Sequence, residues 1–178
     1  LEELSDGILN LTGNINFYRS DVEIDNLFIE NVFAEDAINI IESNYLISNL
    51  KIINSRSDGI DSDFSNGKIN NSVFKDIGGD AIDLSGSETY LGNIEILNVS
   101  DKGISVGENS NLIADNIKIK NSKIGIATKD GSKTNIKKCL IKDSTLADVS
   151  TFLKKDFYNF QKMIVENCEL KSKKKFLN

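Results

Sequence analysis

Residues 79–126 read GDAIDLSGSETYLGNIEILNVSDKGISVGENSNLIADNIKIKNSKIGI, and the same pattern returns every 22 residues within this stretch. A small residue followed by Ile marks each return, at Ala81, Gly103 and Gly125. The same pair also occurs earlier in the chain, at Ala37 and Gly59, with the same spacing of 22 residues. Self-similarity of this length is typical of a repeat architecture in which each repeat packs on its neighbours.

Asparagine recurs with nearly the same period at two other places in the repeat. The first column comprises Asn26, Asn49, Asn71, Asn93, Asn116, Lys138 and Asn167, and the second comprises Asn31, Asn54, Asp76, Asn98, Asn121 and Asp143. Asn tolerates the left-handed backbone of a sharp corner, and stacked Asn side chains pass amide hydrogen bonds from layer to layer. The two columns therefore predict corners between successive strands.

Three short apolar runs per repeat are too short and too evenly interrupted for helices. Helical solenoid repeats are longer, at about 33 residues or more, and the phrase of leucine-rich repeats is missing. We therefore predict an all-β fold, a right-handed parallel β-helix of about seven coils with 22–23 residues per coil. Stacked Ile columns are expected to fill its interior.

The repeat predicts one β-helix domain at residues 1–170 and a basic tail or linker at 171–178. Two segments exceed the period, so insertions are expected near 12–23 and 150–163. Cys139 and Cys168 occupy one inward column in adjacent coils. We expect two buried thiols that pack as small hydrophobic groups. A disulfide between them is geometrically conceivable, but it prefers a longer Cα separation than a tight ladder gives.

Composition excludes several classes of function. The net charge of −6 offers no basic face for phosphates, which argues against nucleic acid as a partner. Histidine is absent, so imidazole catalysis and ordinary zinc or iron sites are excluded. No apolar stretch reaches the roughly 18 residues of a membrane span, so no direct span is expected.

Aspartates gather on one side of coils two to four, on a surface that we call the acidic face. It comprises Asp36, Asp58, Asp61, Asp63, Asp80 and Asp83. Like charges at ladder spacing repel, so such a face is solvated, protonated or bound to a cation. Lys102 lies one coil beyond Asp80, at the end of the column that Asp58 and Asp80 form. Turn chemistry, a calcium or sugar-binding patch and a catalytic centre all remain open as explanations.

The phrases SDGIDSD, GGDAIDLSGS, SDKGISVG and IGIATKD resemble the pectin-lyase-like β-helix superfamily. They lie at positions similar to the active-site motifs of family 28 polygalacturonases. That resemblance implies that Asp58 and Asp80 correspond to two of the catalytic acids. Gly79 replaces the third acid, Lys102 replaces the histidine, and the arginine is absent, which argues against the hydrolysis that needs a flanking acid and base.

A second resemblance covers residues 54–170. GDAIDLSGS, DKGISVGENS, IGIATKD and LADVSTFLKKDFYNFQKMIVENC are similar to a β-helix region that accompanies CotH-kinase-like domains in large bacterial proteins. This resemblance implies a module of the bacterial cell envelope or of a secreted protein, with no established activity of its own.

We therefore expect a non-catalytic spacer or glycan- or protein-binding module that needs no cofactor. The alternatives are a calcium-assisted polysaccharide lyase and a degenerate polygalacturonase-like glycosidase. In the lyase, calcium held by Asp61, Asp83 and Asp63 would face the carboxylate of a uronate, and Lys102 would take the α-proton. The glycosidase would use Asp58 and Asp80 as its catalytic carboxyl groups. The expected partners are a polysaccharide or another cell-surface domain, together with self-association through the terminal coils.

Overall fold

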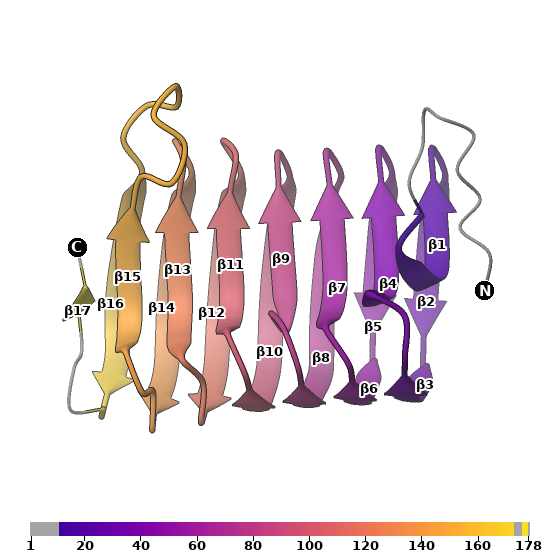
Figure 1. Ribbon diagram of the computed structural model, residues 1–178, viewed down its shortest axis with the longest axis horizontal. Helices are drawn as coiled ribbons and strands as arrows, with labels where there is room; N and C mark the ends of the chain where they lie inside the picture. The colour runs from indigo at the N-terminus through magenta and orange to yellow at the C-terminus, as the bar shows by residue number, and fades with distance from the viewer. Residues whose placement is uncertain (1–10, 173–175, 178) are drawn as a thin grey trace.

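The protein is a β-solenoid whose coils stack along one axis (Figure 1). The computed structural model describes residues 11–172, 176 and 177. These residues contain strands and turns but no helix, and so no helix long and apolar enough to cross a membrane. From β1 to β15 the chain completes six turns, and the strands pair in parallel throughout. The predicted all-β solenoid is confirmed.

Sheet A forms one face and contains eight strands of the described chain. In spatial order they are β1 (Gly13–Tyr18), β4 (Asp36–Ile41), β7 (Asp58–Asp63), β9 (Ile82–Ser85), β11 (Lys102–Gly107), β13 (Ile124–Lys129), β15 (Ala147–Phe152) and β17 (Phe176–Leu177).

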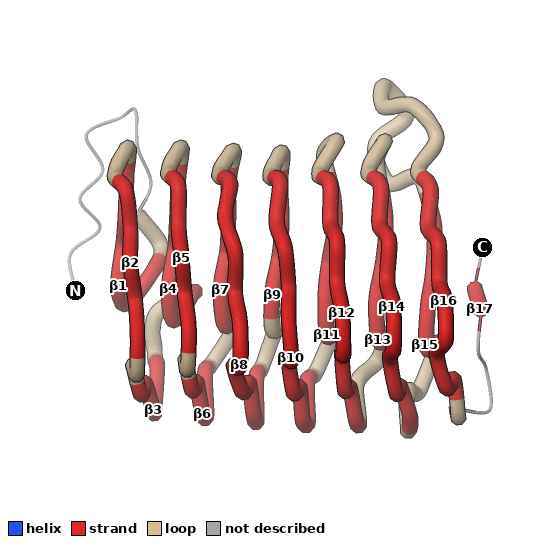
Figure 2. Tube along the Cα trace, turned by 180° about the vertical axis from the view of Figure 1, so that it is seen from behind, coloured by secondary structure: helices blue, strands red, loops and turns tan. Residues whose placement is uncertain are grey.

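Sheet B covers the rest of each coil and is bent, so that a coil has three faces (Figure 2). Its strands are β2 (Asp21–Asp25), β3 (Phe28–Val32), β5 (Asn44–Ser48), β6 (Lys51–Ser55), β8 (Asn66–Ile77), β10 (Glu88–Val99), β12 (Asn111–Lys120), β14 (Lys133–Lys142) and β16 (Lys162–Leu170). The first two coils have separate strands on either side of the bend, whereas later coils run through it as one strand.

Stacked Ile side chains form the interior, as predicted. In sheet A, Ile38, Ile60, Ile82 and Ile104 lie in register on neighbouring strands, and each is fully buried. The small residue before each Ile is required by close packing: a Cβ on Gly59 would lie 2.5 Å from the carbonyl oxygen of Ala81. The 22-residue period is therefore the length of one coil.

Both predicted Asn columns form left-handed corners. All thirteen of their residues, Lys138 included, have φ between 50° and 62°. The amide ladder is present as well: Asn116 donates to Asn93 at 2.8 Å, and Asn93 donates to Asn71 at 2.9 Å. Because most other residues resist this conformation, Asn is the favoured residue there.

The third corner, after each strand of sheet A, uses a different device that the sequence reasoning missed. A Ser follows this corner in the first six coils, and the backbone N–H of the first five donates to the hydroxyl of the equivalent Ser one coil on. This serine ladder comprises Ser20, Ser43, Ser65, Ser87, Ser110 and Ser132. It satisfies backbone groups that the sharp turn removes from the strand pairing.

The insertion predicted near 12–23 is wrong. Residues 13–18 form β1, in which Ile15 and Phe17 pair with Ile38 and Ile40 of the next coil. The alternation of Ile15 and Phe17 supplies the same two inward side chains as every other coil, so the segment is an ordinary strand.

The predicted second insertion corresponds to the loop at residues 153–161, which projects beyond the coil ends (Figure 1). It is tied to earlier coils, because Asp130 accepts the backbone N–H groups of Lys154 and Lys155. The predicted basic tail, in contrast, is partly structural. Phe176–Leu177 form β17 and pair with β15, which begins another rung of sheet A.

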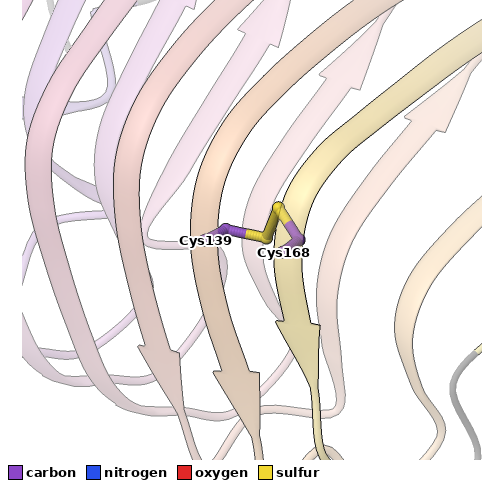
Figure 3. The surroundings of a disulfide bond; sticks show 2 residues. All are labelled: Cys139 and Cys168. Carbon is purple, nitrogen blue, oxygen red and sulfur yellow. A yellow bond between two sulfur atoms is a disulfide. The ribbon is translucent and has the colours of Figure 1, made fainter.

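Cys139 and Cys168 form a disulfide, so the prediction of two free thiols is wrong (Figure 3). They face each other on the paired strands β14 and β16, with their Cα atoms 4.4 Å apart. This separation lies at the short end of the range that disulfides span, so a parallel ladder does accommodate the bond.

Candidate functional site

The acidic face lies on the outer surface of sheet A, over β4, β7 and β9. Strand pairing places Asp36 beside Asp58, and Asp61 beside Asp83. Because side chains alternate between the two faces of a strand, Asp61 and Asp83 point outward beside the inward Ile60 and Ile82. Asp36 and Asp58 lie at the starts of their strands, where Asp36 is buried and Asp58 is half-buried. The sequence therefore predicted the grouping of the acidic side chains correctly.

Asp58 and Asp80 hold together successive turns of the solenoid. Oδ1 of Asp58 accepts the backbone N–H of Asp80 at 2.8 Å, and Oδ1 of Asp80 accepts that of Lys102 at 2.8 Å. The Gly-Gly pair before Asp80 permits this approach, since a Cβ on Gly79 would lie 1.9 Å from Oδ1 of Asp58. Each of these two carboxylates thus replaces a backbone acceptor at the turn that leads into sheet A.

Lys102 is engaged by two carboxylates. Its Nζ lies 3.1 Å from both oxygens of Asp80 and 2.5 Å from Oδ2 of Asp101. Asp101 in turn pairs with Lys123 at 3.2 Å. Burial lowers the pKa of Lys102, but the hydrogen bond to Asp101 and the charges of Asp80 and Asp101 outweigh burial, so the pKa lies above its usual value. At neutral pH the amine is therefore protonated.

Burial raises the pKa of most carboxyl groups on the acidic face. The pKa of Asp61 rises to about 9, first through loss of hydration and then through the charge of Asp63. Loss of hydration also raises the pKa of Asp58, to about 7, although the hydrogen bond from the N–H of Asp80 lowers it. The values for Asp36 and Asp63 rise to about 6. Part of this face is therefore protonated at neutral pH.

Three carboxylates come close enough to share a cation. Oxygens of Asp58, Asp80 and Asp83 lie within 4.8 Å of one another, whereas Asp61 and Asp63, named with Asp83 from the sequence, fall outside this group. Two nearby oxygens, Oδ1 of Asp83 and Oγ of Ser105, are buried and lack a hydrogen-bond partner within the described chain. Asp83 and Ser105 pair across β9 and β11.

The repeat placed Lys102 beside Asp80, but its second partner Asp101, and the Lys123 that pairs with Asp101, were not predicted. Asp101 directly precedes Lys102 and Lys123 lies 22 residues after Asp101, so the period contained a signal for this chain of charges. Asp101 was overlooked because neighbouring side chains along a strand were expected to point to opposite faces and not to contact each other.

The stacked coils and the outward carboxylates define a β-solenoid protein with an acidic face. The chain belongs to the right-handed β-helix family, since the family model described as "Right handed beta helix region" matches residues 13–153 and 63–176. No curated protein matches the sequence. Among solved structures it is similar to trypsin-treated QnrB1, a plasmid-mediated fluoroquinolone resistance protein, with 11% identity and a TM-score of 0.23 over 83% of this chain and 92% of that chain. A likeness at that level carries no argument about function.

Proposed function

We propose that this β-helix is a non-catalytic module of a larger cell-envelope or secreted bacterial protein, where it acts as a spacer or a glycan- or protein-binding surface. The observation that carries the proposal is the bonding of Asp58, Asp80 and Lys102 to one another. Both carboxylates accept backbone N–H groups of the next coil, and the amine bridges two carboxylates. Groups committed to holding the turns are poorly placed to take or give protons.

The pectin-lyase-like alternatives both need a free acid–base pair. A lyase base must be deprotonated to take the α-proton of a uronate, yet the pKa of Lys102 is raised. A glycosidase needs one carboxyl on each side of the scissile bond. Asp58 and Asp80 instead each accept a backbone N–H of the next coil, and the amine of Lys102 contacts both oxygens of Asp80. This arrangement favours a structural role for both.

The disulfide supports the proposed location outside the cytoplasm. Disulfides form and persist in oxidising compartments and are rare in reducing ones. Cys139 and Cys168 are the two cysteines of the chain, and both are used in the bond.

We expect no cleavage of acidic polysaccharides by the purified protein. Incubation with polygalacturonate or alginate, with and without calcium, should leave both the ultraviolet absorbance and the number of reducing ends unchanged. A calcium-dependent rise in absorbance that Lys102→Ala abolishes and Lys118→Ala preserves would instead establish a lyase. Lys118 is exposed on sheet B, which makes it a matched control.

The calcium-binding alternative rests on Asp58, Asp80 and Asp83. Their carboxylates are the hard oxygen ligands that Ca²⁺ prefers, and the unpartnered oxygens of Asp83 and Ser105 fit a site that completes its contacts with an ion. Bound calcium would supply positive charge that neutralises these carboxylates and offers a docking point for a uronate. The chain's own residues would then orient the sugar without cleaving it.

In this alternative, calcium raises the melting temperature, because a ligand of the folded state stabilises it by about 2.7 kcal/mol at a hundredfold excess over Kd. Asp83→Asn should abolish the rise, whereas Asp61→Asn should preserve it, because Asp61 lies outside the group. Calorimetry with calcium, magnesium and a chelator measures the effect. A melting temperature indifferent to calcium would leave the acidic face without a cation.

A further inference from the structure

The last coil leaves an open edge on sheet B. Strand β16 ends the order of that sheet, so within the described residues its outer N–H and C=O groups have no strand partner. Its inward side chains Met163, Val165 and Leu170 are partly exposed, whereas the equivalent Ile136 and Ile141 of β14 are fully buried. An open edge with partly exposed apolar side chains favours pairing with another strand.

Among residues 11–172, the first coil has a similar edge at β2, the other end of the sheet. Its inward Ile24 and Leu27 are partly exposed, while Ile47 and Leu50 of the next coil are buried. In the described chain, every partly buried hydrophobic residue that packs against the core lies in the first or last coil. These residues are Ile15, Phe17, Ile24, Leu27, Ala34, Met163, Val165, Cys168 and Leu170.

The first coil is acidic, whereas the last coil is balanced. Residues 11–35 contain five carboxylates and one arginine, whereas residues 147–172 contain four lysines and four carboxylates. Like charges oppose association of two acidic first coils, whereas the lysines of the last coil can pair with the carboxylates of the first.

We propose that the protein binds a second copy of itself head to tail, with β16 of one copy paired in parallel to β2 of the next. Continuing the register of the solenoid places Lys162 opposite Asp21 and Lys171 opposite Glu30, two pairs of opposite charge. The same register places Asn167 on Asn26, which have the same left-handed φ of 55°. The asparagine corner would therefore continue from one copy into the next.

The same register also fills the apolar interior. Val165 would lie on Ile24, Cys168 on Leu27, and Leu170 on Ile29. One like-charged pair arises, Glu166 opposite Asp25, but Glu166 already pairs with Lys137 at 3.4 Å. The coil boundary between two copies would thus resemble the boundary between two coils of one chain.

Head-to-tail contact does not close on itself. Each added copy presents the same free end as the one before, so the association continues as a series rather than stopping at a dimer. A head-to-head dimer would instead place two acidic ends together, which the charges disfavour.

Strand β17 limits this contact in sheet A. It already pairs with Val149 and Ser150 of β15, in the rung that β1 of the second copy would enter. The second copy must therefore displace β17 or dock through sheet B alone. A variant that ends at Ser172 is expected to associate at lower concentration than the full chain.

Sedimentation velocity at increasing concentration tests the proposal on the full chain. We expect a series of oligomers whose association constant falls at least about tenfold between low and high salt, because exposed charges are screened. Asp21→Lys with Glu30→Lys should make the chain monomeric, and so should Lys162→Glu with Lys171→Glu. All four side chains are exposed, and circular dichroism confirms that both variants fold.

Sedimentation of an equimolar mixture of the two variants is the most discriminating experiment. In the mixture each reversed end meets a complementary end, so association should return although neither variant associates alone. Failure of the mixture to associate, or an association that stops at a dimer, overturns the proposal. So does a chain that remains monomeric both with and without residues 173–178.

Discussion

The protein should melt at a higher temperature at about pH 5.5 than at about pH 8. The pKa values of Asp36, Asp58, Asp61 and Asp63 are raised to between about 6 and 9, chiefly by burial. In the unfolded chain an Asp has a pKa of about 3.9. Between the pKa of the unfolded Asp and the raised pKa values, the folded chain therefore binds more protons than the unfolded chain. The free energy of unfolding falls as the pH rises through that interval.

The lowered pKa of Asp101 acts in the opposite sense but outside this window. Burial raises the pKa of Asp101, but Lys102 and Lys123 lower it by more than burial raises it. The stability that Asp101 contributes is therefore lost only below about pH 4. The raised groups thus dominate between pH 5.5 and 8. Because they are coupled, we expect a combined loss of about 2 kcal/mol, or about 4–8 °C in melting temperature for a chain of this size.

Asp61→Asn should remove the largest part of this pH dependence. Asn16 and Asn39 occupy the same column of sheet A, so an amide fits there. The variant need not take up a proton on folding, so it should melt above the wild type at pH 8 and close to it at pH 5.5. Asp76→Asn is the matched control, an exposed Asp in a column that also holds Asn54 and Asn98. Equal slopes for the wild type and Asp61→Asn would contradict the raised pKa of Asp61.

The coil could be predicted from the sequence because its signals repeat. Ile60 and Ile82 are equivalent in position, and so are Asn71 and Asn93, so that an ambiguous strand in one coil is resolved by its copies in the others. The constraint is steric at both places: an inward column needs an apolar side chain, and a left-handed corner favours Asn. Averaging over copies made the period and both corners clear.

Features that occur in only one or two coils could not be recognised by comparing the copies of the repeat. The first coil was misaligned because Asn14 replaces the small residue, so Ile15 lost its marker. The hydrogen bonds of Asp58 and Asp80 depend on the turn formed by Gly78 and Gly79, which is unique to that coil. The serine ladder also repeats with the coil, as at Ser43 and Ser65, so its column could have been found from the sequence, but it was not singled out.

The acidic face was predicted as a cluster but not as a network. Spacing places Asp58, Asp61 and Asp83 on one surface, and the structure agrees. It does not reveal that a carboxylate accepts a backbone N–H instead of facing solvent, because that depends on how closely two coils approach. Which aspartates accept a backbone N–H and which do not could therefore be seen only in the structure.

Reduction of the bond between Cys139 and Cys168 should destabilise the last coil by about 3–4 kcal/mol. The two cysteines are 29 residues apart, and opening a loop of that length returns this much conformational entropy to the unfolded chain. The last coil is also the coil whose inward Met163, Val165 and Leu170 are only partly covered. It therefore has little packing to compensate for loss of the bond.

The effect should be confined to the end of the solenoid. In stacked repeats the stability is approximately a sum of repeat terms and nearest-neighbour terms, so distant coils are unaffected. Hydrogen exchange measured with and without reductant should show protection of the β16 amides falling by at least about a hundredfold, since about 1.4 kcal/mol corresponds to a factor of ten. The amides of β8 and β10 should exchange at unchanged rates.

Replacement of both cysteines by valine separates the covalent bond from packing. Val keeps an apolar group in the inward column that Ile94 and Ile117 also occupy, so Cys139→Val with Cys168→Val should reproduce the exchange pattern of the reduced wild type. The variant should not respond to reductant. If β16 of the wild type keeps its protection after reduction, side-chain packing alone holds the last coil, and the bond contributes no measurable stability there.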